Sequence, residues 1–198
     1  MKIIHFASLI EGYLDELLVK EILKGIAGGL DQGFTFNRHS KFAPFKGGSK
    51  NKSKVVVGVK NLSFSIALEI KNSNHPILFV AGVDSDKDDF QELINQLEKE
   101  VHEIAKKSTI IFVAVRDVET WAEYLLKPES KKGELDKRSS KDQIYVDGKS
   151  NGQNAKKVIN QLRDNNTFTA NSLTHLATQS PSFAHFHQQI IAYLQNIS

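Results

Sequence analysis

The sequence predicts an α/β protein with a mostly parallel central sheet flanked by helices, and with a helical C-terminal extension. Short apolar runs, typical of strands buried on both faces, alternate with segments whose apolar residues follow the helical period. The connections between them are short, which favours parallel strands joined by covering helices. The chain has 198 residues, so we expect a single domain.

Each element follows from its own pattern. Strands are expected at residues 2–10, 77–83 and 109–115, with a further short strand at 55–59. Helices are expected at 13–27, 61–71, 86–107, 118–126, 154–162, 173–178 and 183–194. We therefore expect an α/β core over 1–126, an exposed basic loop over 127–150, and C-terminal helices over 151–198 that pack on the core.

Composition excludes several classes of protein. The chain is 40% hydrophobic and 25% charged, which is ordinary for a soluble globular protein. No apolar run approaches the roughly 20 residues that span a bilayer, so we expect no membrane segment. The chain has no cysteine, which excludes disulfides and thiolate metal sites and fits a cytoplasmic location.

Two aspartates follow the apolar run at 77–83. Asp84 and Asp86 are two residues apart, so on an extended chain their side chains point the same way. Two neighbouring carboxylates repel each other unless a cation lies between them, and Mg²⁺ prefers such oxygen ligands. Alternatively, the pair is only the N-terminal cap of the next helix. Taken alone, the motif fits both interpretations equally.

Two other predicted strands also end in acidic residues. Glu11 follows the first strand, with Asp15 four residues later, and Glu119 follows the strand at 109–115 with Asp117 beside it. The carboxyl ends of parallel strands share one edge of the sheet, and ligands of such sheets bind there. The sequence therefore predicts that these acids converge, which favours a metal site over a cap.

A basic stretch precedes the second half of the core. No acidic residue occurs between Gln32 and Leu68. We expect its basic residues to contact a phosphate backbone, although a solvated loop is the alternative. The candidates for nucleic-acid binding are Arg38, Lys41, Lys46, Lys50, Lys52 and Lys54.

Several motifs resemble a known family. The segment I-E-G-Y-L-D-E at 10–16 and the segment G-V-D-S-D at 82–86 look like the Toprim domain of topoisomerases, primases and nucleases of the overcoming-lysogenization-defect type. The E-G-x-x-D-E form resembles the nuclease branch. R-D-V-E-T-W-A-E-Y-L at 116–125 and S-P-S-F-A-H-F at 180–186 are similar to segments of small stand-alone Toprim-like proteins. The resemblance implies a Toprim or Rossmann-like fold.

The resemblance also implies an activity, that of a nuclease depending on Mg²⁺ or Mn²⁺ and using two ions. Glu11, Asp84 and Asp86 would hold the first ion, and Asp15 and Glu119 would hold or orient a second. A lysine would neutralise charge on the phosphate; the candidates are Lys149, Lys156 and Lys157, with a plain solvated helix face as the alternative.

The expected partners are nucleic acid and a separate ATPase, since the larger nucleases of this type carry an ATPase on the same chain. Small proteins of this kind are suspected to act in anti-phage defence. A homodimer is also possible. Two other functions remain open: a phosphatase or phosphotransferase with Asp84 as nucleophile and Asp86 as acid, and a catalytically silent Toprim module that binds an ATPase.

Overall fold

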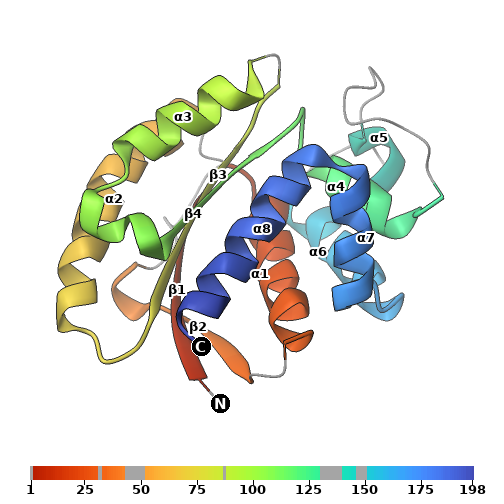
Figure 1. Ribbon diagram of the computed structural model, residues 1–198. Helices are drawn as coiled ribbons and strands as arrows, with labels where there is room; N and C mark the ends of the chain where they lie inside the picture. The colour runs from red at the N-terminus through yellow and green to blue at the C-terminus, as the bar shows by residue number, and fades with distance from the viewer. Residues whose placement is uncertain (1, 31–32, 43–51, 87, 130–139, 146–150) are drawn as a thin grey trace.

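The computed structural model describes residues 2–30, 33–42, 52–86, 88–129, 140–145 and 151–198. Within these ranges, four parallel strands form one sheet in the order β2-β1-β3-β4, with helices on both faces (Figure 1). The predicted α/β class is confirmed.

The bounds of the elements are as follows. The strands are β1 (Lys2–Ile10), β2 (Phe34–Arg38), β3 (Ile77–Asp84) and β4 (Thr109–Ala114). The α-helices are α1 (Tyr13–Gly28), α2 (Lys52–Asn72), α3 (Phe90–Glu100), α4 (Glu119–Leu126), α5 (Lys141–Ile144), α6 (Gly152–Asp164), α7 (Ala170–Gln179) and α8 (Pro181–Asn196); two 3₁₀ helices are η1 (Ser40–Phe42) and η2 (Glu103–Ser108).

The central strand β3 shows why the sheet is covered on both sides. Its residues from 77 to 83 are buried, and they alternate between two apolar cores. Leu78 and Val80 belong to the core under α1 and α8, whereas Phe79 and Ala81 belong to the core under α2 and α3 (Figure 1). An unbroken apolar run is what a strand buried on both faces requires.

The valine-rich segment 55–59 is not a strand, which corrects the prediction. It lies inside α2, where Val55 and Val59 are fully buried, one helical turn apart, and face the sheet. Branched residues favour strands only weakly, and burial on the helical period decides the outcome here. The strand β2, which was not predicted, instead forms one edge of the sheet beside β1.

The helix predicted over 86–107 is shorter than expected. It begins at Phe90, capped by the Asp89 carboxylate, which accepts a 2.8 Å bond from the Glu92 amide. It ends at Glu100, and the separate 3₁₀ helix η2 follows. The apolar residues therefore keep the helical spacing beyond Glu100, although the α-helix itself ends there.

The loop predicted at 127–150 is not exposed throughout. Residues 140–145 include the short helix α5, and Ser140, Ile144 and Tyr145 are buried against the core. Ile144 and Tyr145 are an apolar anchor, and they bring the start of α5 towards the carboxyl edge of the sheet.

The C-terminal helices lie on the same side of the sheet as α1, and α8 contacts the sheet directly. The last of them, α8, lies along β4 and α7 (Figure 1). Its Gln189 carboxamide accepts a 3.1 Å hydrogen bond from the Ile111 amide and donates a 2.6 Å bond to the carbonyl of the same residue. Because β4 is an edge strand, this side chain pairs with backbone groups that would otherwise be open to another strand.

Candidate active site

The carboxyl ends of β1 and β3 bring the first two acids together. Ile10 pairs with Gly82 in the sheet, so Glu11 follows β1 beside the end of β3. The Glu11 carboxylate accepts a 3.3 Å hydrogen bond from the Asp84 amide. The Asp84 carboxylate in turn accepts a 3.1 Å bond from the Val118 amide, which ties it to the segment leading into α4.

Asp15 joins this group from the first turn of α1. Its carboxylate is 4% exposed and accepts a 3.0 Å hydrogen bond from the Gly12 amide, closing the start of the helix. A β-carbon at Gly12 would lie 2.7 Å from both carboxylate oxygens of Asp15. Glycine is therefore favoured at position 12, because a larger residue would displace the buried carboxylate.

The third strand end contributes Glu119 and Asp117, both buried. Glu119 is the first residue of α4, and its carboxylate accepts a 3.1 Å bond from the Tyr145 hydroxyl. Asp117 accepts bonds of 3.1 and 3.0 Å from the amide and hydroxyl of Thr120. Tyr145 was not predicted to take part; it reaches the site because α5 packs against α4.

Burial and mutual repulsion perturb these carboxyl groups strongly. Burial, followed by the charge of Glu119, raises the pKa of Asp15 to about 7. Burial also raises the pKa of Asp84 well above its ordinary value, and the charges of Asp15 and Glu119 add to the effect. The pKa values of Glu11 and Glu119 are raised by burial as well. These acids therefore form one electrostatic cluster, of a kind that is concentrated at functional sites.

Sequence reasoning missed Lys141, whose positive charge lowers the pKa values of Glu119 and Glu11. Burial alone would lower its pKa, but the charges of Glu119, Asp117 and Asp84 raise it above the ordinary value. Lys141 is the first residue of α5. The signal that could have found it is the apolar run from Ile144 to Val146 in an otherwise polar stretch, because such a run anchors its neighbours.

Asp86 lies apart from the buried carboxylates. The strand β3 ends at Asp84, and Asp86 has a left-handed backbone with φ 56°, so the extended geometry expected for the pair does not hold. Its side chain is 67% exposed and forms a 3.3 Å ion pair with Lys52. The charge of Asp86 still reaches Glu11 and raises its pKa.

The two loops at this edge are held in a strained conformation. Arg116 is also left-handed, with φ 67°. Its amide donates a 3.0 Å bond to the Ser85 hydroxyl, and its carbonyl accepts a 3.3 Å bond from the Asp86 amide. A left-handed backbone costs roughly 1–2 kcal/mol for a residue with a side chain. Strain of this kind is typical of functional sites, where surrounding contacts maintain it.

The side chains of the cluster suit a metal ion by the type of donor atom they offer. Oxygen donors from Glu11, Asp15, Asp84 and Glu119 suit Mg²⁺ or Mn²⁺, and a bound cation would relieve their repulsion. Among the residues that the structure describes, no group of three or more His, Asp or Glu side chains is arranged to hold an ion. The carboxylates accept bonds from backbone amides instead, so metal binding requires side-chain rearrangement.

The predicted nucleic-acid contacts are largely engaged with acids. Arg38 forms a 2.6 Å ion pair with Glu16, and Lys41 forms one of 2.6 Å with Glu69. Lys52 pairs at 2.7 Å with Asp88 as well as with Asp86, and it donates a 2.9 Å bond to the Ser85 carbonyl. Lys54 is exposed on α2. Although residues 32–68 contain no acid, acidic residues from other parts of the chain lie beside their basic side chains in the fold.

The remaining lysine candidates lie elsewhere. Lys156 is exposed on α6, whereas the pKa of Glu11 is lowered by the charges of Lys52 and Lys141 and that of Glu119 by the charge of Lys141. Lys46, Lys50 and Lys149 lie outside the described residues.

No protein-family model matches the chain. Comparisons with curated proteins and with solved structures also gave no match. The Toprim resemblance therefore rests on the motifs quoted above, and the function must be argued from the cluster itself.

Proposed function

We propose that the protein is a metal-dependent nuclease that hydrolyses phosphodiester bonds of nucleic acid at the carboxyl edge of its sheet. The observation that carries the proposal is the convergence of Glu11, Asp15, Asp84 and Glu119 in one repelling cluster, with Lys141 at its margin. Purely structural acids would be expected to have cationic partners in sufficient number; this cluster has an excess of negative charge.

Each residue has a role in this proposal. Glu11, Asp84 and Asp86 hold one Mg²⁺ or Mn²⁺, and Asp15 and Glu119 hold or orient a second. When bound, the ions supply a water activated at neutral pH and a charge sink for the phosphate. Lys141 binds a non-bridging phosphate oxygen and stabilises the charge that builds up there.

The first test is a cleavage assay on plasmid, single-stranded DNA and RNA with Mg²⁺, Mn²⁺ or EDTA. We expect cleavage that requires the divalent ion and falls at least about 100-fold in Glu11→Gln and Asp84→Asn. Glu98→Gln on the exposed face of α3 is the matched control. Full activity of Glu11→Gln and Asp84→Asn would remove the cluster from the reaction.

The role of Lys141 is separable from metal binding. In Lys141→Gln we expect the cleavage rate to fall while the affinity for Mn²⁺, measured by calorimetry, stays the same or rises, because a competing cation has been removed. Weaker Mn²⁺ binding in this variant would contradict the assignment. Lys156→Gln, on the exposed face of α6, is the control.

The hydrogen bonds of the carboxylates favour one second candidate, a catalytically silent Toprim-like module. Asp15 and Asp84 already accept bonds from backbone amides, and a module that never binds metal could keep them so. The two candidates differ in one measurement: a silent module shows no change in melting temperature when Mn²⁺ is added. A phosphatase with Asp84 as nucleophile is disfavoured, because it gives Glu11 and Asp15 no role, and because burial raises the pKa of Asp84 and so opposes formation of a free nucleophilic carboxylate.

We also propose that a separate ATPase acts with this chain in anti-phage defence or DNA processing, and a pull-down from the native host would test this. We also propose that the protein acts in the cytoplasm. Within the described ranges, no helix combines the length and apolar character needed to cross a bilayer.

A further inference from the structure

Residue 116 combines a left-handed backbone with an arginine side chain. In the described part of the chain, the residues other than glycine that have a positive φ are Asp86, Arg116 and Asn166. Aspartate and asparagine tolerate this conformation best, because their short polar side chains bond to nearby backbone groups. Arginine is not favoured there, so the need for a turn does not explain why position 116 carries this residue.

The bonds around Arg116 fix it at the carboxyl edge of the sheet. Its amide donates a 3.0 Å bond to the buried Ser85 hydroxyl, and its carbonyl accepts a 3.3 Å bond from the Asp86 amide. Two residues further on, the Val118 amide donates a 3.1 Å bond to the Asp84 carboxylate. Arg116 is therefore held against the loop that follows β3, beside the carboxylate cluster of the candidate active site.

The guanidinium of Arg116 pairs with none of the acids near it. The next residue, Asp117, accepts hydrogen bonds from the amide and hydroxyl of Thr120. Asp86, which bonds to the backbone of Arg116, forms its ion pair with Lys52 instead. Within the described residues the Arg116 side chain has no ion pair or hydrogen bond, and it is partly exposed. Its charge is therefore available to a ligand.

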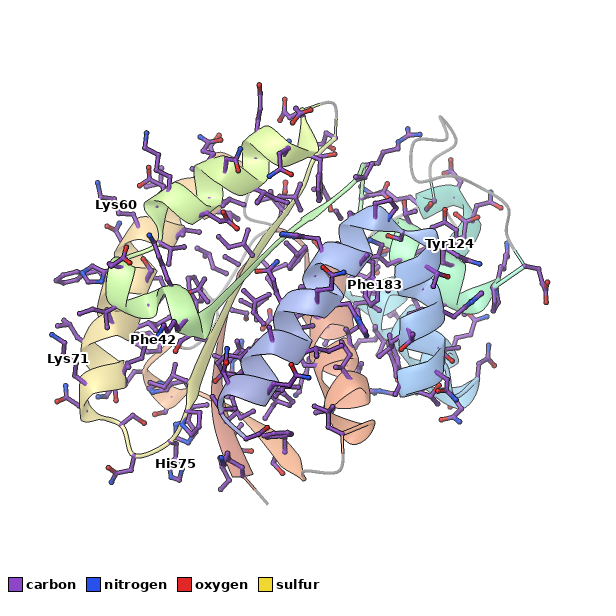
Figure 2. The ribbon with its side chains drawn as sticks, in the orientation of Figure 1. Phe42, Lys60, Lys71, His75, Tyr124 and Phe183 are labelled. Atoms are coloured by element: carbon purple, nitrogen blue, oxygen red, sulfur yellow. The ribbon has the colours of Figure 1, made fainter. Side chains whose placement is uncertain are left out.

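A cation without a partner is ordinary on a protein surface, but its setting here is not. Lys60 and Lys71 show the ordinary case: they lie on regular helix, are exposed, and point away from the sheet on the outer side of α2 (Figure 2). Arg116 instead lies on strained backbone at the candidate site. Strain that stability alone would remove is typical of a position kept for binding or catalysis.

We infer that Arg116 binds a backbone phosphate of the substrate strand, next to the phosphate that is cleaved. The inference rests on the proposed function, because it takes the ligand of the carboxylate cluster to be a polynucleotide. A guanidinium presents a planar fork of N–H donors that matches the oxygens of a phosphate. Such a contact positions the strand and reads no base, so it serves any sequence.

The first test measures binding separately from cleavage. The probes are fluorescent single-stranded DNA and RNA oligonucleotides, titrated with the full chain over a KCl series, with Ca²⁺ as the oxygen-binding ion in place of Mg²⁺. Each phosphate contact on a single strand contributes about 0.7 to the slope of log affinity against log salt. Arg116→Gln should therefore reduce that slope by about 0.7 and weaken binding roughly 3- to 30-fold at low salt, to a similar extent for every sequence.

Two variants serve as matched controls. Arg116→Lys keeps the charge and loses the fork, so it should restore the slope and recover only part of the affinity. Lys99→Gln removes an exposed charge from the last turn of α3, the end of that helix remote from Asp89 and the carboxyl edge. It should change neither the slope nor the affinity.

Arg116→Gly separates a binding role from a structural one. Glycine adopts a left-handed backbone without steric cost, so the midpoint of urea unfolding should stay the same or rise. The salt slope should fall as it does in Arg116→Gln. A side chain that only supports the fold would give the reverse, a lower midpoint with an unchanged slope, and that result would overturn the inference.

The binding data distinguish failure of this inference from failure of the proposed nuclease. An unchanged slope in Arg116→Gln overturns the inference even if the chain cleaves its substrate. A reduced slope in a chain that never cleaves supports the phosphate contact and refutes the nuclease alone. A chain that binds neither oligonucleotide overturns both.

Discussion

Asp15→Asn should stabilise the metal-free protein, and the gain should grow with pH. The folded state holds the pKa of Asp15 at about 7 instead of 3.8, so its proton is bound more tightly in the folded than in the unfolded chain. That contribution to stability is fully present below pH 4 and is lost as the pH rises through 7. Asparagine is neutral throughout, and its side-chain oxygen can still accept the hydrogen bond from the Gly12 amide.

The magnitude follows from the shift of about three pKa units. At about 1.36 kcal/mol per unit, the raised pKa of Asp15 lowers the free energy of unfolding, relative to a neutral side chain, by about 2 kcal/mol at pH 5.5 and about 4 kcal/mol at pH 8. Urea unfolding in EDTA should therefore show Asp15→Asn more stable than the original by about 2 kcal/mol at pH 5.5 and about 4 kcal/mol at pH 8. Asp164→Asn on the exposed face of α6 is the control.

Adding Mg²⁺ completes the experiment. The ion should stabilise the original protein at pH 8, because it binds the ionised cluster of the folded state, and should stabilise Asp15→Asn less. The reasoning is refuted if Asp15→Asn is no more stable than the original at pH 8 in EDTA, or if the difference does not change between pH 5.5 and pH 8.

Two further predictions concern the neighbours of the cluster. Lys52→Gln should tighten Mn²⁺ binding by up to about fivefold in calorimetry, because it removes a cation from Asp86, and an unchanged affinity would mean that Asp86 is not a ligand. Gly12→Ala should lower the free energy of unfolding by about 1–3 kcal/mol in urea, since its β-carbon meets the Asp15 carboxylate. Gly28→Ala, where a β-carbon meets nothing within 4 Å, should not destabilise, and equal losses in the two variants would contradict the steric explanation.

The strands at 2–10, 77–83 and 109–115 could be predicted because each is an apolar run that must be buried on both faces. Their ends then brought Glu11, Asp84 and Glu119 to one edge through topology alone. Local pattern failed where tertiary contacts decide. The valines of residues 55–59 favour a strand, but this segment is helical, and Val55 and Val59, one helical turn apart, are buried against the sheet.

The charges around the site could not be predicted from sequence windows. Arg38 and Lys41 look unopposed along the chain, but Glu16 and Glu69 meet them in the fold. Lys141 reaches the cluster because two apolar residues after it are buried, which is a property of the packed structure. Asp86 departs from the expected direction because its backbone is left-handed.

The helix that carries Glu119 is fixed by residues made much later in synthesis. The indole of Trp121 donates a 3.1 Å bond to the Ser182 hydroxyl, and its ring contacts Phe183 and Phe186 of α8. At ~5–20 residues per second, the interval between the emergence of Glu119 and of Phe186 lasts on the order of 3–13 s. During that interval α4 lacks its support, so the cluster is incomplete. Under the proposed activity, the active site is therefore assembled only after Phe183 and Phe186 have emerged.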